Sequence, residues 1–98
     1  MINDNPVYEK EIITQDGAHM KVKYEIIEEN NSYGIAISLF ENNGKLNEFV
    51  EIKDITQKNI EIHTLSMVLY KYEVTPVTLY DVLDGLLADF DNMEKLLK

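Results

Sequence analysis

The sequence predicts an α+β fold, in which a four-stranded antiparallel β-meander is followed by two α-helices packed on one face of the sheet (ββββαα). Two observations on the 98-residue chain predict it. In the first half, turn-forming residues recur at regular spacing, and the apolar residues between them alternate with a period of two. In the second half, the apolar period changes to that of a helix. Strands followed by helices are typical of α+β proteins, and the length fits a single domain over residues 1–98.

The turns locate the strands. Strands are expected at about 6–14, 19–28, 33–40 and 46–52. The turn segments are "QDGA" (Gln15–Ala18), "ENNS" (Glu29–Ser32) and "ENNG" (Glu41–Gly44). Asp-Gly and Asn-Gly pairs supply the positive φ that tight hairpins require. In the third strand, small Gly34, Ala36 and Ser38 share one side. No remaining segment would cover that side, so we expect it to face water or a second copy.

The helical period begins after Ile52. Helices are expected at about 57–72 and 77–97. Thr56 is the expected N-cap of the first helix, and Thr78 with Asp81 resembles a capping box at the start of the second. The expected inner face of the first helix is Ile62, Leu65, Val68, Leu69 and Tyr72. The expected inner face of the second is Leu79, Val82, Leu83, Leu86, Leu87, Phe90 and Leu97.

Composition excludes several classes of function. The net charge is −9, all nine basic residues are lysine, and the chain has no cysteine. Without arginine, an acidic chain is poorly suited to phosphate contacts, so no direct nucleic-acid binding is expected. No apolar run approaches the length of a membrane span, and the N-terminus lacks the pattern of a signal peptide. A cytoplasmic protein without disulfides, and without membrane contact, is therefore expected.

No constellation of residues indicates catalysis. His19 and His63 lack the partner spacing of a metal site, so no metal ligand is predicted. The serines lack the context of a nucleophile, and the four glycines form no phosphate-binding motif. We therefore expect no catalytic residue, no cofactor and no enzymatic activity.

Two surfaces are candidates for a partner. The outer side of the second helix would carry Asp81, Asp84, Gly85, Ala88 and Asp91. That side either allows close approach of a partner or is a solvated face, because carboxylates near a helix N-terminus also have a local electrostatic role. On the first helix, Ile60 and Met67 lie together away from the inner face, either as an exposed patch or with Ile60 tucked under the sheet edge.

Two segments carry a resemblance to a known family. The strand segment "SYGIAI" (Ser32–Ile37) and the helix start "VTPVTLYDVLDGLL" (Val74–Leu87) resemble DUF6514, a group of small uncharacterised proteins of low-GC Gram-positive bacteria. The resemblance covers the chain from about Tyr24 onward. It implies a bacterial, cytoplasmic, single-domain protein, and no activity, ligand or catalytic residue.

Three hypotheses for function follow. The favoured one is a non-enzymatic regulatory or adaptor protein that acts by protein–protein interaction, with another protein as partner and a homodimer as an expected assembly. The second is an acidic nucleic-acid mimic that inhibits a nucleic-acid enzyme through its carboxylates. The third is a small-molecule-binding domain with a pocket lined by Tyr24, Tyr33 and Tyr72.

Overall fold

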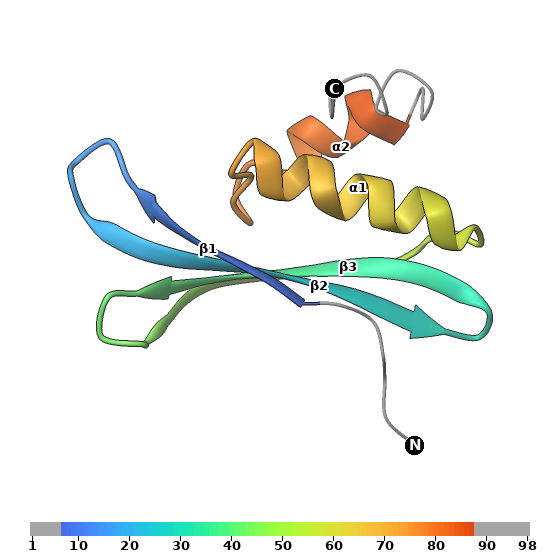
Figure 1. Ribbon diagram of the computed structural model, residues 1–98, viewed down its shortest axis with the longest axis horizontal. Helices are drawn as coiled ribbons and strands as arrows, with labels where there is room; N and C mark the ends of the chain where they lie inside the picture. The colour runs from blue at the N-terminus through green and yellow to red at the C-terminus, as the bar shows by residue number, and fades with distance from the viewer. Residues whose placement is uncertain (1–6, 88–98) are drawn as a thin grey trace.

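The computed structural model describes residues 7–87 and confirms the predicted α+β fold (Figure 1). One antiparallel sheet has the order β1 (Val7–Ile13), β2 (His19–Glu29), β3 (Ser32–Glu41) and β4 (Leu46–Thr56). Two helices follow, α1 (Asn59–Lys71) and α2 (Leu79–Leu87). Residues 88–97 of the predicted second helix lie outside the described residues. Within residues 7–87, no helix combines the length and apolar character needed to cross a membrane.

The core lies between the sheet and α1. Figure 1 shows α1 directly above the sheet and α2 farther from it. The sheet contributes alternate residues, as the period of two predicted: Tyr24 pairs with Ile37 in register, and both are fully buried. The helices contribute the buried side chains of Ile62, Leu65, Val68, Leu69, Leu79 and Leu83. Tyr72, which was expected on this face, follows the end of α1 and is exposed.

The fourth strand is longer than predicted. It continues from Ile52 to Thr56 through an irregularity, because the register on β3 shifts between Tyr33 and Ile35. Asp54 lies in this irregular stretch with φ of 57°, a left-handed value. This interruption of the regular strand explains why the residues after Ile52 were not predicted as part of the strand. Gly34 faces it: a Cβ on Gly34 would lie 2.2 Å from the backbone oxygen of Ile52, so the strands approach too closely for any side chain there.

The start of α1 differs from the prediction. The N-cap is Lys58, not Thr56, and Lys58 makes no side-chain capping bond. Thr56 still supports the helix start from outside. Its hydroxyl accepts a hydrogen bond from the Lys58 N–H (3.1 Å) and donates one to Glu61 Oε1 (2.6 Å). The threonine was correctly associated with the helix start, but it acts from two residues before the N-cap.

The side-chain bonds at the start of α2 lie one turn earlier than predicted, between Thr75 and Thr78 instead of between Thr78 and Asp81, and the helix itself begins two residues after the predicted 77. The N–H of Thr75 donates to Thr78 Oγ1 (3.2 Å), and the N–H of Thr78 donates to the Thr75 carbonyl (3.1 Å). Pro76 follows Thr75, where its fixed φ suits the first residue of a helical turn. The Thr78 hydroxyl therefore bonds with Thr75, and α2 proper begins at Leu79.

The second face of the sheet is not the smooth surface that was expected. Ala36 and Ser38 are buried although the helices lie on the opposite face. Their register partners on β2 are Glu25 and Lys23, which form an ion pair of 3.5 Å. Long charged side chains can cover small neighbours with their aliphatic portions. This face is therefore charged, and its small residues are not available to a partner.

Candidate functional site

The described structure holds a groove beside the end of the first strand. Its volume is about 840 Å³. It is lined by Ile12, Ile13, Thr14, Gln15, Val68, Tyr72, Glu73, Val74, Thr75, Thr78 and Val82. Ile12, Val68 and Val74 are buried, whereas Ile13 (67% exposed) and Tyr72 (52% exposed) stand at its rim. Among these lining residues, Glu73 is the one with a carboxyl side chain.

One wall is the end of the β1–β2 hairpin. In Figure 1 this hairpin bends upward, at the left, to the level of the helices. Gly17 has φ of 87°, and its N–H donates to the Thr14 carbonyl (2.9 Å). The Thr14 hydroxyl and the Ala18 N–H both donate to the Asp16 carboxylate. These bonds lower the pKa of Asp16, so the turn keeps its negative charge beside the groove.

The other wall begins where α1 ends. Glu73 has φ of 56°, a left-handed conformation in which glycine is usual at a helix end. The N–H of Glu73 donates to the Tyr70 carbonyl (3.3 Å), and the N–H of Val74 donates to the Leu69 carbonyl (3.0 Å). This is the bond pattern of a Schellman motif. It reverses the chain sharply, and it places Tyr72, Glu73 and Val74 together on the groove.

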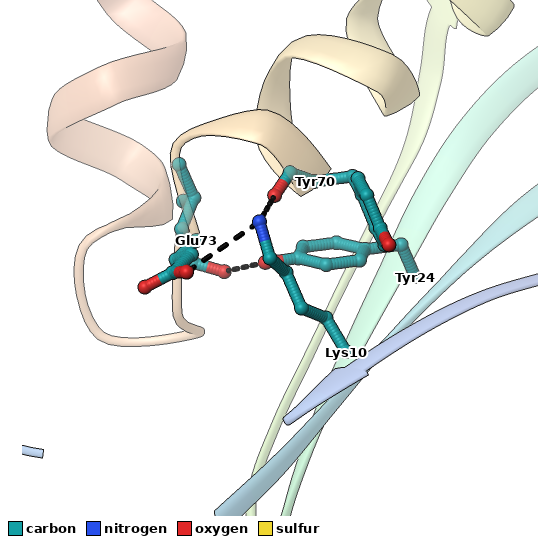
Figure 2. A network of polar contacts seen from close by, with 5 residues as sticks. Lys10, Tyr24, Tyr70 and Glu73 are labelled. Carbon is teal, nitrogen blue, oxygen red and sulfur yellow. Dashed lines mark hydrogen bonds and ion pairs between the residues drawn. The ribbon is translucent and has the colours of Figure 1, made fainter. Parts of the chain in front are cut away.

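A polar cluster joins the two walls (Figure 2). Lys10 of β1 donates from Nζ to the Tyr70 carbonyl (3.1 Å) and lies 3.4 Å from Glu73 Oε2. The same ammonium lies 4.7 Å from the centre of the Tyr70 ring. A cation at the C-terminus of a helix is favourable because the last carbonyls carry partial negative charge. The buried hydroxyl of Tyr24 donates to the Val74 carbonyl (2.8 Å). The edge strand and the helix end are therefore held together below the groove.

The electrostatics of this cluster favour a structural role. Burial raises the pKa of Tyr24, and the nearby negative charge of Glu73 raises it further. The hydroxyl therefore stays protonated near neutral pH and acts as a fixed donor. The Glu73 carboxylate is held by Lys10. The raised pKa of Tyr24 makes this hydroxyl a poor proton acceptor or donor for a substrate near pH 7. In residues 7–87, no three histidine, cysteine or acidic side chains are grouped in a way that could hold a metal ion.

The sequence-predicted surface residues are only partly brought together. Ile60 (70% exposed) and Met67 (38% exposed) are both exposed on α1, so the alternative in which Ile60 tucks under the sheet edge is wrong. On α2, Asp81 is exposed, and Gly85 is exposed with open space beside it. Asp84 lies in α2, but its side chain is outside the described structure. Ala88 and Asp91 lie outside the described residues.

Sequence reasoning missed the groove. It named Tyr72 as a pocket residue, but it grouped Tyr72 with Tyr24, which is buried in the core, and with half-buried Tyr33. Two signals pointed to the groove. The consecutive apolar residues Ile12 and Ile13 break the alternation at the end of a strand, and an aromatic residue, Tyr72, follows the end of a helix.

The sequence was also compared with known protein families, curated proteins and solved structures. Residues 3–89 match the sequence profile described as Family of unknown function (DUF6514). The chain belongs to the DUF6514 family. The match begins well before Tyr24, so the family resemblance includes the first strand and the whole groove. No curated protein and no solved structure matches the chain closely enough to extend that assignment. The site of this DUF6514 member must therefore be interpreted from its own residues.

Proposed function

We propose that this DUF6514 protein is a non-enzymatic protein-binding module, a small bacterial regulatory or adaptor protein that acts in the cytoplasm by docking to another protein. The observation that carries the proposal is the groove, with its buried apolar floor and its exposed rim residues Ile13 and Tyr72. Apolar side chains that are exposed around a concave surface are typical of interaction sites. The groove offers an apolar contact area for a partner. Its one carboxylate, on Glu73, already forms an ion pair with Lys10, so the contact area itself is the feature that supports docking.

The alternative of an acidic nucleic-acid mimic is less well supported. A mimic requires carboxylates spread over one continuous surface. Lysines interrupt the glutamates on the open face of the sheet: Lys21 lies 3.8 Å from Glu9, and Lys53 lies 3.3 Å from Glu29. This interleaving disfavours phosphate mimicry there.

Small-molecule binding has one observation in its favour. A groove of about 840 Å³ lies within the size range of ligand sites. Specific ligand sites also contain a few convergent polar groups, and here the ionised group is held by Lys10. A rise in melting temperature with a metabolite library would support this alternative.

A pull-down with surface variants tests the proposal. The immobilised full chain would be exposed to lysate of its source organism at low and high salt, and retained proteins would be identified by mass spectrometry. Ile13→Lys alters the groove rim, and Ile60→Lys is a matched control, because the two side chains are similarly exposed at 67% and 70%. We expect one protein to be retained through high salt by the wild type and by Ile60→Lys, and lost by Ile13→Lys. Circular dichroism would confirm that both variants fold.

Three other outcomes would count against the proposal. If no protein is retained at either salt concentration, the proposal of a protein-binding module is contradicted. Equal retention by all three chains would place any binding surface away from the groove. A nucleic-acid enzyme that is retained only at low salt would favour the mimic, since electrostatic binding weakens with salt.

A further inference from the structure

The outer edge of β1 has backbone groups available for pairing. β1 is at the end of the sheet order, and among the described residues no strand pairs with its outer side. In an antiparallel pair, residues alternate between those that exchange hydrogen bonds with the neighbour and those whose N–H and C=O point away. Thr14 bonds to the Ala18 carbonyl at the hairpin end. Thr14 is therefore a residue that bonds across the hairpin, and so are Ile12 and Lys10 before it. The residues between them, Ile13, Glu11 and Glu9, have backbone N–H and C=O groups that point outward.

The groove lies at the hairpin end of this edge. Ile12, Ile13, Thr14 and Gln15 are consecutive and all line it. Neighbouring residues of a strand point to opposite faces of the sheet. Ile12 and Ile13 are the last two residues of β1 and point to opposite faces, so the groove meets the strand at its outer edge, and Thr14 and Gln15 continue the wall into the turn. Across the groove from β1 lies an apolar wall that includes Val82 of α2.

The opposite edge of the sheet is different. The pairing of β4 with β3 is irregular at two places, between Tyr33 and Ile35 and between Leu39 and Phe40. Such irregularities twist an edge and hinder the addition of another strand. β1 pairs with β2 in a continuous register from Val7 to Ile13. Of the two edges, β1 is the one with a regular geometry for strand addition.

We infer that the edge of β1 and the groove beside it bind an extended segment of the partner protein as a fifth strand of the sheet. This inference rests on the proposed function, because it specifies how a protein partner is recognised. Backbone hydrogen bonds to Glu9, Glu11 and Ile13 supply affinity, and alternate side chains supply specificity. The partner side chains on the helix side of the sheet are apolar, and the one beside Ile12 enters the groove against Val68 and Val82.

The charged residues on β1 determine which side chains the partner segment carries on the other face of the sheet. Glu9 and Glu11 are exposed on the face of the sheet away from the helices, where Glu9 lies 3.8 Å from Lys21 and Glu11 is the carboxylate that a partner strand would meet. Side chains directly opposite on neighbouring strands interact, and opposite charges there are favourable. The partner segment therefore alternates apolar residues with lysine or arginine. A second copy of this chain is disfavoured, since antiparallel pairing of two β1 strands around residues 9–11 would place glutamate opposite glutamate.

A synthetic peptide tests this recognition mode. The probe is a capped seven-residue peptide of alternating lysine and valine, added to the ¹⁵N-labelled full chain. The first control peptide has the same composition with lysines and valines in two blocks. Two further control peptides carry N-methyl groups on the odd or on the even residues, so that each lacks the N–H donors of one peptide edge. Binding is followed by amide chemical shifts, and the pairing edge by amide hydrogen exchange.

We expect saturable binding of the alternating peptide with a Kd below about 1 mM. At nine-tenths occupancy, exchange at Glu9, Glu11 and Ile13 should slow by about tenfold. One of the two alternate N-methylation patterns should abolish binding, and the blocked peptide should bind at least about tenfold more weakly. Glu11→Lys should weaken binding by about five- to tenfold, whereas Glu28→Lys, which makes the same charge change on exposed β2, should have less than a twofold effect.

The opposite results would overturn the inference. They are no binding at 1 mM, binding without protection of these amides, or equal effects of Glu11→Lys and Glu28→Lys. Protection of the same amides without peptide would mean that the chain itself or a second copy occupies the edge. If the pull-down retains a partner and these results are negative, the protein-binding function stands and the strand-addition mode fails.

Discussion

The sharpest test of the packing compares two buried hydroxyls. Tyr24 and Ser66 are both fully buried. The Tyr24 hydroxyl donates to the Val74 carbonyl at 2.8 Å, whereas Ser66 Oγ has no hydrogen-bond partner within residues 7–87. Tyr24→Phe removes the donor and leaves a buried carbonyl unpaired, which costs about 1–3 kcal/mol. Ser66→Ala removes an unsatisfied group and improves helix propensity, so it should be neutral or stabilising by up to about 1 kcal/mol.

Urea unfolding of the two variants and the wild type measures this difference. Equal slopes across the three chains would show that midpoint changes report stability. A loss of about 2 kcal/mol in Tyr24→Phe corresponds to a fall in Tm of about 8–16 °C for a domain of this size. A neutral Tyr24→Phe combined with a destabilising Ser66→Ala would refute the assignment of the hydrogen bonds and, with it, the link between β2 and the end of α1.

Three further predictions follow from single positions. Gly34→Ala should destabilise the fold by about 1–3 kcal/mol or more, because its Cβ would lie 2.2 Å from the Ile52 oxygen; a loss below about 1 kcal/mol on urea unfolding would contradict that close approach. Gly85→Ala should stabilise by about 0.5–1 kcal/mol, since the new methyl meets nothing within 4 Å; a lower melting temperature would count against it. Burial raises the pKa of Tyr24 above its ordinary 10.0, so the unfolded chain releases this proton first as the pH rises. The stability that the Tyr24 hydroxyl contributes is therefore fully present below about pH 10 and is lost as the pH rises above it. The difference in urea midpoint between wild type and Tyr24→Phe should narrow between about pH 9 and 11, and a constant difference would contradict this.

The fold was predictable because local signals agree with the tertiary structure. The turn at Asn30 and Asn31 has φ of 54° and 62°, values that asparagine tolerates and that a two-residue hairpin requires. Alternation then fixes which side of each strand faces α1, since a slip of one residue would invert every side chain. The continuation of β4 beyond Ile52 was not predictable, because its cause is the close approach of Gly34 on another strand.

The candidate site could not be assembled from sequence for a similar reason. Its walls come from residues 12–15 and from residues 68–82, which only the folded sheet and helices bring together. Sequence periodicity identifies residues that face the core, but a groove at a strand edge is lined by neighbours that face opposite sides. The helical period of α1 placed Ile60 and Met67 together away from its inner face, because that property depends on one helix alone, but it left open whether Ile60 is exposed, as the structure shows it to be.

The polar cluster gives the proposed binding mode its physical basis. Glu73 occupies a left-handed position in which a non-glycine residue costs about 1 kcal/mol, and its carboxylate reaches Lys10 on the edge strand. Lys10 in turn holds the end of α1 through the Tyr70 carbonyl. The strand edge and the opposite wall are thus fixed relative to each other before a partner arrives. A preformed groove reduces the ordering cost of binding, which matters most for an extended segment that must itself become ordered. The left-handed conformation of Glu73 is therefore the local cost of the contact that joins the end of α1 to the edge strand, and the proposed binding mode uses that fixed arrangement.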